Sequence, residues 1–167
     1  MAKNSRLEKQ RRMIVLLALF LLKYKHGKTN PQKNQVINFV SIHNLIQVRP
    51  NDQKTVASEE EAWANALAWT RNRLKDEGFV AKPDSGIWSI TPLGEEEILR
   101  WLEGAVYATR HMKSNELLAQ LSDILREDFI VTPSTFEKAK EAYEIYCDRF
   151  PERKNQFPEK FEILSLF

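Results

Sequence analysis

Apolar residues near the start of the chain are grouped in a way that predicts buried helices. Ten consecutive apolar residues, Met13–Leu22, stand between basic residues and predict a helix over about Ser5–Lys25. Ten residues are about half of what a membrane-spanning helix needs, and no signal-peptide cleavage site follows, so we expect the core helix of a cytosolic protein. Pro31 can start a second helix, over about Gln32–Leu45. Its apolar residues, expected mostly to face inward, are Val36, Ile37, Phe39, Val40 and Ile42.

A capping pattern marks the start of a third helix. Ser58 and Glu61 are spaced so that each can cap the other's backbone amide, which predicts a helix over about Glu59–Glu77, ended by Gly78. Its apolar side recurs at helical spacing and comprises Trp63, Ala66, Leu67, Thr70 and Leu74. Trp69 lies off this side, so it either packs against another element or stays partly exposed.

Two short β-prone runs follow the third helix. Phe79–Lys82 and Ile87–Ile90 are separated by a Pro-Asp-Ser-Gly turn, which predicts a β-hairpin. Three helices followed by a hairpin are the element order of a winged helix-turn-helix. In that arrangement the third helix fits the DNA major groove and the hairpin, or wing, reaches the phosphates beside it. The expected fold class is therefore mainly α with a small β-hairpin, a winged helix-turn-helix followed by a C-terminal helical extension.

The rest of the chain predicts further helices. They are expected over about Pro92–His111, over about Ser114–Arg126, and from Thr132 or Ser134 to about Arg149. The apolar tail, Pro151–Phe167, is expected to dock on a helix or on a partner chain. We divide the chain into a winged-helix domain with a basic N-terminal helix, residues 1–104, and a helical extension for dimerisation or docking, residues 105–167.

Charge is distributed unevenly along the chain. The net charge of the whole sequence is +2, but residues 1–58 hold 11 Lys or Arg and 2 Asp or Glu, a net charge of +9. Residues 59–128 hold 8 and 14, a net charge of −6. Such a split favours contact with a polyanion through the N-terminal third, and a solvated basic helix is the alternative.

Residues 69–80 (WTRNRLKDEGFV) and 86–94 (GIWSITPLG) resemble the N-terminal winged-helix domain of Mrr-type restriction proteins. In that family a Trp stands five residues before a helix Leu, as Trp69 stands before Leu74. Its wing has the form G-x-aromatic-x-apolar-T-x-x-G, as at Gly86–Gly94. The resemblance is dense over about residues 63–98 and implies a DNA-binding winged helix. The layout also resembles PadR-like transcription regulators, in which the helices after the winged helix dimerise.

The chain departs from Mrr-type proteins after the wing. Those enzymes continue into a nuclease domain with an acidic residue and an E-x-K motif on adjacent strands. The nearest candidate is Glu152–Lys154 with Asp123 or Asp128, and no strand pattern surrounds it. Isolated histidines and the lone Cys147, expected to be buried, offer no other catalytic or metal-binding arrangement. We therefore expect no enzyme, no metal and no cofactor.

Polar residues on the third helix, in the hairpin and in the loop before the third helix are the candidate DNA contacts. Arg pairs with guanine and Asn with adenine in the major groove, whereas Lys and Ser suit phosphates. The candidates are Arg71, Asn72, Lys75, Asn65, Lys82, Ser85, Lys54 and Arg49. Against this, the carboxylates of Glu59–Glu61 would stand at the start of the third helix and repel phosphate.

Two functional hypotheses follow. The first is a protein that binds double-stranded DNA, a small prokaryotic or mobile-element transcriptional regulator of the cytoplasm, forming a homodimer through its C-terminal helices. The second is a non-catalytic protein-interaction module built on a winged helix.

Overall fold

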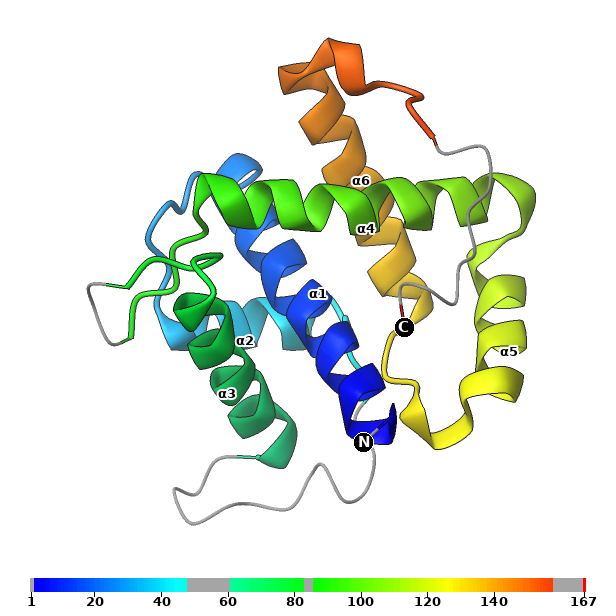
Figure 1. The fold of residues 1–167 in the computed structure, drawn as a ribbon, viewed down its shortest axis with the longest axis horizontal. Helices are drawn as coiled ribbons and strands as arrows, with labels where there is room; N and C mark the ends of the chain where they lie inside the picture. The colour runs from blue at the N-terminus through cyan, green and yellow to red at the C-terminus, as the bar shows by residue number, and fades with distance from the viewer. Residues whose placement is uncertain (1, 48–60, 83–85, 158–166) are drawn as a thin grey trace.

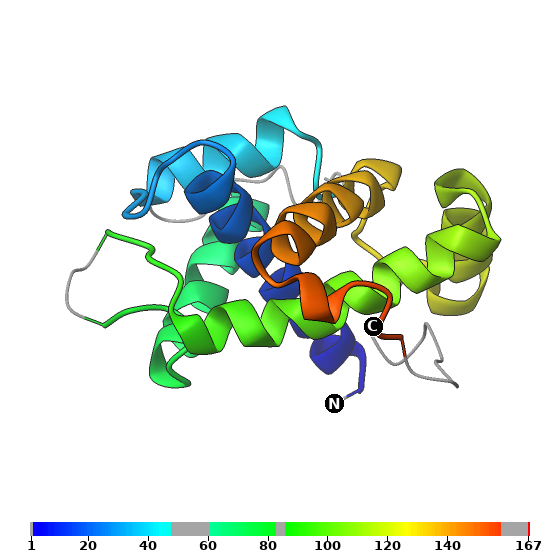
Figure 2. The same ribbon diagram turned by 90° about the horizontal axis from the view of Figure 1, so that it is seen from above.

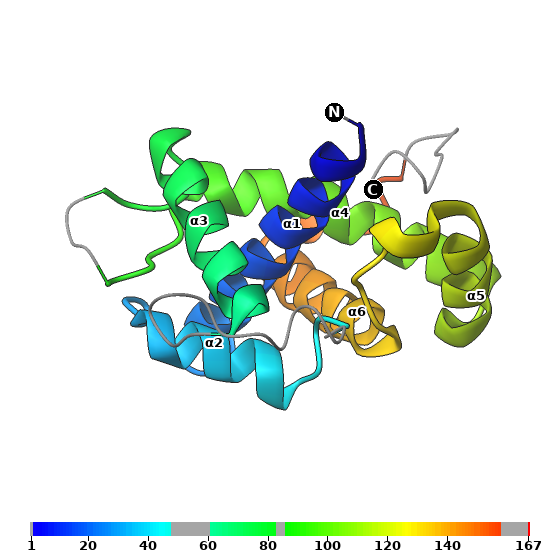
Figure 3. The same ribbon diagram turned by 90° about the horizontal axis from the view of Figure 1, so that it is seen from below.

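The computed structural model describes residues 2–47, 61–82, 86–157 and 167, and this part of the chain is mainly helical (Figure 1). Helix α1 passes through the middle of the molecule, with α2 and α3 towards one end and α5 at the other (Figures 1 and 3). The α-helices are α1 (Ala2–Tyr24), α2 (Lys33–Ile42), α3 (Ala62–Asp76), α4 (Pro92–His111), α5 (Ser114–Leu125) and α6 (Pro133–Arg149). Two short 3₁₀ helices are η2 (Arg126–Asp128) and η3 (Pro151–Arg153).

The apolar stretch of α1 is the centre of the core. Every side chain from Met13 to Leu22 is at most 4% exposed, so this part of the helix has no solvent-facing side. Helices α2, α3, α4 and α6 all pack on α1. The Phe20 ring, for example, lies 4.7 Å from the ring of Tyr24 and 6.2 Å from that of Tyr146 on α6. The prediction of a buried first helix is confirmed. No helix in the described ranges is long and apolar enough to cross a membrane.

The helices after the hairpin share this core. Helix α4 crosses both α1 and α6 and packs on both (Figures 1 and 2). Residue 104, where we divided the chain, lies inside α4, and the buried apolar side chains on both sides of it form one cluster. The division therefore falls within a continuous helix and a shared core.

A buried amide joins the first helix to the segment between α5 and α6. Gln10 is fully buried, and its Nε2 donates to the backbone oxygen of Asp128 at 2.6 Å. Its Oε1 accepts from the backbone N–H of Ile130 at 2.8 Å. Farther along, the Thr132 hydroxyl donates to the backbone oxygen of Asn44 at 2.5 Å, so the same segment also holds the chain after α2. These bonds satisfy backbone groups that would otherwise be buried without partners.

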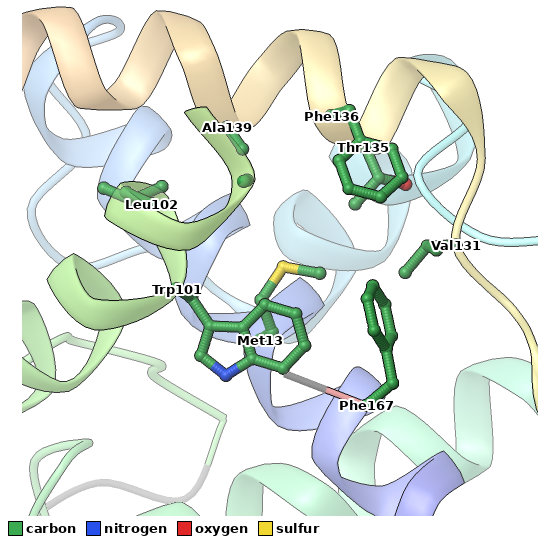
Figure 4. A pocket seen from close by; sticks show the side chains of 9 residues that line it. Met13, Trp101, Leu102, Val131, Thr135, Phe136, Ala139 and Phe167 are labelled. Carbon is green, nitrogen blue, oxygen red and sulfur yellow. The ribbon is translucent and has the colours of Figure 1, made fainter. Parts of the chain in front are cut away.

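The last residue closes the core from the other side. Phe167 is 3% exposed, and the centre of its ring lies 5.4 Å from that of Trp101 (Figure 4) and 5.8 Å from that of Phe129. Together with Met13 and Phe136 it lines a small apolar cavity of about 10 Å³. That is room for about one water molecule. Docking of the apolar tail is therefore confirmed for Phe167, while residues 158–166 lie outside the described residues.

Capping residues account for most of the helix limits. Thr91 and Thr132 each stand before a Pro and accept from the N–H three residues on, as predicted for α4 and as one of the two alternatives for α6. Helix α3 begins at Ala62 with Glu61 at the N-cap position, three residues after the predicted start at Glu59, while the predicted cap Ser58 lies outside the described residues.

Helix α2 also differs from its prediction. It ends at Ile42, not Leu45, because Asn44 adopts a positive φ of 52° and turns the chain. The side chain of Ile42, expected to face inward, is 77% exposed. Val36, Phe39 and Val40 are buried as predicted.

No regular strand is present in the described part of the chain. Two isolated antiparallel bridges, Gln32–Ile87 and Val80–Ile90, are formed instead. The β-hairpin and the winged-helix arrangement are therefore not confirmed.

Candidate nucleic-acid interface

Helix α3 is fixed to α1 along one side. Leu67, Thr70 and Leu74 on this side have no exposed surface. The Thr70 hydroxyl donates to Oε2 of Glu8 on α1 at 3.2 Å, and the Arg73 guanidinium reaches the same oxygen at 2.7 Å. An apolar seam bordered by these polar contacts sets the rotation of α3 about its own axis, and so decides which residues face away from the protein.

The opposite side of α3 carries a row of residues that we call the outer ridge, comprising Asn65, Trp69, Asn72 and Asp76. Trp69 is 59% exposed, Asp76 is exposed, and the two Asn side chains are partly exposed. Lys75, also partly exposed, borders the ridge. Of the candidate contacts, Asn65 and Asn72 lie on this ridge and Lys75 lies on its flank.

Arg71 does not join the ridge. It is 5% exposed, and its Nη2 donates to the backbone oxygen of Ile87 at 2.8 Å. Its Nη1 donates to Oδ1 of Asn72 at 3.2 Å, and the guanidinium lies 5.9 Å from the ring centre of Trp88. Burial lowers the pKa of Arg71 from its ordinary value, because the charged form loses hydration. Arg71 thus ties α3 to the segment after it, and its burial does not favour a base contact.

The segment from Phe79 to Ile90 doubles back beside α3 (Figure 1). The N–H of Ala81 donates to the Ser89 oxygen at 2.8 Å, and the N–H of Thr91 to the Phe79 oxygen at 3.1 Å. The N–H of Trp88 donates to the Pro31 oxygen at 2.7 Å, so the chain just before α2 lies beside residues 86–90. These bonds hold two antiparallel segments, residues 79–82 and 86–90, which we call the first and second arms. Lys82 is exposed at the described end of the first arm, while Ser85 lies outside the described residues.

Gly78 and Gly94 explain why the arms can lie against the start of α4. Gly78 has a φ of +85°, which an L side chain rarely adopts, and it reverses the chain after α3. At Gly94 a Cβ atom would stand 2.2 Å from the Phe79 oxygen, so only Gly permits this approach. Between them, the Thr91 hydroxyl donates to the Gly78 oxygen at 2.6 Å and accepts from the Gly94 N–H at 3.1 Å. The T-x-x-G part of the sequence pattern thus has a structural cause.

Three basic side chains of the N-terminal third pair with carboxylates of other elements. Arg12 on α1 forms a two-point ion pair with Glu77 after α3, with Nη1 to Oε1 at 2.6 Å. This hydrogen bond lowers the pKa of Glu77 and raises that of Arg12. Lys23 lies 3.6 Å from Glu95 on α4, and Lys25 is paired with Glu141 on α6. Basic and acidic parts of the sequence therefore meet in space, which sequence position alone does not indicate.

The remaining predicted contacts lie outside the described residues. Arg49 and Lys54 belong to residues 48–60, as do Glu59 and Glu60. Glu61 is described: it precedes α3, and its carboxylate accepts from the indole N–H of Trp63. Its negative charge is thus engaged beside the helix start.

Residues considered for a nuclease site do not come together on strands. Glu152 and Arg153 lie in η3, and Lys154 follows it. Asp123 is on α5, and Asp128 is in η2. Among the described residues, no group of three or more His, Cys, Asp or Glu is placed to hold a metal ion.

The family of the chain follows from a comparison with family models. The model described as the Mrr N-terminal domain matches residues 17–100, which run from the buried part of α1 through α2, α3 and the paired arms into α4. The chain belongs to the Mrr N-terminal domain family. This family is associated with DNA binding in restriction-type proteins. No curated protein and no solved structure matched the chain in the other two comparisons.

The Mrr N-terminal domain match confirms the resemblance inferred from the sequence. It includes Gly78, Thr91 and Gly94, whose contacts fix the arms against α4, and it includes the whole outer ridge of α3. It stops at residue 100, so it leaves out the second half of α4 together with α5 and α6.

Proposed function

We propose that the chain binds double-stranded DNA through the outer ridge of α3, with the arms around Phe79–Ile90 acting as the wing of a winged helix-turn-helix. The observation that carries this proposal is the side of α3 that faces away from α1. It presents Asn65 and Asn72, whose amides can pair with adenine, on a fold of the Mrr N-terminal domain family. The order α1, α2, α3 and two arms, with the chain before α2 bonded to the second arm, supports the winged-helix assignment.

The dimensions of α3 suit this mode of binding. An α-helix with its side chains is about 10–12 Å across, and the major groove of B-DNA is about 12 Å wide. With the ridge in the groove, Lys75 would face one phosphate strand from the flank of α3. Lys82 would reach a second strand from the arm beside the helix. Both Lys side chains are at least partly exposed and stand on the elements nearest the ridge.

A salt series on variants that each lose one positive charge tests this proposal. Binding of a labelled duplex of about two helical turns is measured by fluorescence anisotropy between about 50 and 200 mM salt. Lys75→Ala and Lys82→Ala should each weaken binding and lower the slope of log K against log salt by about one unit. Lys113→Ala is the matched control, because this exposed Lys stands before α5 at the far end of the molecule (Figure 3).

Three outcomes would contradict DNA binding through α3. They are no binding at the lowest salt, affinity that does not change with salt, and an effect of Lys113→Ala as large as that of Lys75→Ala. All three variants replace exposed or partly exposed side chains, and their folding is checked by the thermal unfolding midpoint.

We further propose that the protein is a homodimeric transcriptional regulator of the prokaryotic cytoplasm, with the dimer formed by the C-terminal helices. Two modules about one helical turn apart read a two-fold DNA site, and this symmetry supports a dimer. Ile124 on α5 is 59% exposed in the single chain and is a candidate for the interface. Light scattering after size exclusion should give twice the chain mass of 19.5 kDa, and Ile124→Glu should return it to the single-chain value.

A second candidate function is favoured by the internal ion pairs. Because Arg12, Lys23 and Lys25 are paired with carboxylates, the +9 region offers fewer charges to a polyanion than its composition suggests. We therefore keep the non-catalytic protein-interaction module as the alternative. It predicts salt-independent binding of a protein partner and no affinity for duplex DNA, so the same salt series separates the two functions.

A further inference from the structure

Trp69 is the unusual residue of the outer ridge. The other three Trp side chains, Trp63, Trp88 and Trp101, are 9%, 2% and 8% exposed, whereas Trp69 is 59% exposed. It points away from the seam between α3 and α1, and its exposed area does not serve the core. A large aromatic side chain that is left in solvent costs free energy unless something covers it.

The neighbours of Trp69 indicate what covers it. Asn65 precedes it by four residues and Asn72 follows it by three, so the three side chains lie side by side along the ridge. Trp69 and Asn72 are separated by about 4.5 Å along the helix axis. Successive base pairs are about 3.4 Å apart. An amide and an indole at this spacing can meet neighbouring base pairs in the same groove.

The chemistry of the major groove limits which base pairs the outer ridge can recognise. Bases within a duplex are stacked on one another, so the face of the indole cannot stack on them. The apolar group that a duplex presents in its major groove is the C5-methyl of thymine. A pair of Asn amides beside an indole therefore fits adenine next to thymine. Guanine and cytosine present no methyl group there and suit Arg and carboxylate side chains.

We infer that α3 recognises A·T base pairs, with Trp69 covering the C5-methyl group of thymine while Asn72 or Asn65 pairs with adenine. This inference rests on the proposed DNA binding and adds the substrate class to it. Trp69 is then a residue that determines specificity through a contact rather than through a hydrogen bond. The burial of Arg71 supports this assignment, because the Arg that would read guanine is bonded to Ile87 and Asn72.

Three synthetic duplexes test the methyl contact directly. They are alternating dA–dT, alternating dA–dU, which differs from the first only by the missing methyl groups, and alternating dG–dC. The full chain should bind dA–dT about three- to fivefold more tightly than dA–dU, the effect of burying one methyl group. It should bind dG–dC more weakly than either. In Trp69→Ala the ratio between dA–dT and dA–dU should fall to about one.

Matched variants show that the effect belongs to Trp69. Trp69→Phe keeps an aromatic ring and should restore part of the ratio between dA–dT and dA–dU. Ile42→Gln removes an apolar side chain that is 77% exposed but lies on α2, outside the outer ridge. It should leave the ratio unchanged.

Fluorescence quenching gives an independent measurement on the natural chain. Acrylamide should quench mainly Trp69, because the other three Trp side chains are buried. Adding the dA–dT duplex should protect Trp69 and reduce the quenching, and Trp69→Phe should lose this protectable signal.

The outcomes distinguish a failure of the proposed DNA binding from a failure of the inferred A·T recognition. No binding to any of the duplexes overturns the DNA-binding function and this inference with it. Salt-dependent binding with equal affinity for dA–dT and dA–dU overturns only the inference. The same holds for DNA binding that leaves Trp69 fully open to acrylamide, which would assign the ridge to a protein partner.

Discussion

Helices α1 and α3 lie side by side, but they meet solvent in opposite ways. From Met13 to Leu22, α1 is apolar on all sides and nearly every atom is buried. Helix α3 is apolar on the side that contacts α1 and carries amides, an indole and a carboxylate on the other. The all-apolar helix organises the core, and the one-sided helix presents a surface. Function is therefore to be sought on α3, although the net positive charge of the sequence lies in the N-terminal third.

The largest expected effect comes from truncating one aromatic residue on each helix. Phe20→Ala should lower the free energy of unfolding by about 3–5 kcal/mol, because Phe20 is 1% exposed and packs between Tyr24 and Tyr146. Trp69→Ala removes a larger ring and should change it by less than about 0.5 kcal/mol. Denaturant unfolding measures both. Equal losses would mean that the outer ridge is part of the core, and the comparison would fail.

A smaller effect is expected from the buried amide of α1. Gln10→Met keeps the size of the side chain but leaves the Ile130 N–H and the Asp128 oxygen without their partner. It should cost about 1–3 kcal/mol. Gln120→Met, an exposed amide on α5, is the control and should be nearly neutral. A neutral Gln10→Met would show that this amide adds nothing to the packing of α1 against the segment between α5 and α6.

Arg71 sharpens the comparison from the other helix. Arg71→Met should destabilise the chain by about 1–2 kcal/mol, because the Ile87 oxygen loses its donor. Hydrogen exchange at the Trp88 amide should also speed up, and Arg71→Lys should not restore it, since Lys lacks the planar fork of Arg. Arg100→Met is the control, because Arg100 is 73% exposed. Unchanged exchange at Trp88 would remove Arg71 from its place between α3 and the arms.

The smallest effect concerns the ion pair that joins the two helices. The pKa of Glu77 is lowered by Arg12, so the stabilisation is fully present above the ordinary value of 4.5 and is lost as the pH falls through the lowered pKa. Glu77→Gln should therefore reduce stability at neutral pH by less than about 1 kcal/mol, because the pair is partly exposed. The difference should vanish in acid. A difference that grows in acid would contradict the assignment.

Local signals in the sequence predicted most of the helices. Thr–Pro pairs at 91–92 and 132–133 fixed the starts of α4 and α6, because Thr caps the helix and Pro suits its first turn. The order of the glycines and the aromatic residue in Gly86–Gly94 also indicated the resemblance to the Mrr N-terminal domain, and the family match confirms it. Trp63, on the predicted apolar side of the third helix, is buried as expected.

Long-range contacts could not be predicted in the same way. The pairs Arg12–Glu77 and Lys25–Glu141 join residues far apart in sequence, so the charge split gave no sign of them. Arg71 shows a different difficulty. Its spacing of four from Leu67 and three from Leu74 placed it near the apolar side, yet its charge suggested exposure. Burial followed because the backbone oxygen of Ile87 accepts its hydrogen bond.

The central position of α1 has a consequence for how the chain folds as it is synthesised. The apolar stretch is made early, but its partners on α4 and α6 follow about a hundred residues later, and Gln10 must wait for Ile130. Such distant pairing slows folding and leaves apolar surface open to aggregation in the meantime. A fragment cut at residue 100, the limit of the family match, would keep that surface uncovered permanently. We therefore expect the family module in this protein to need the C-terminal helices as built-in partners for folding.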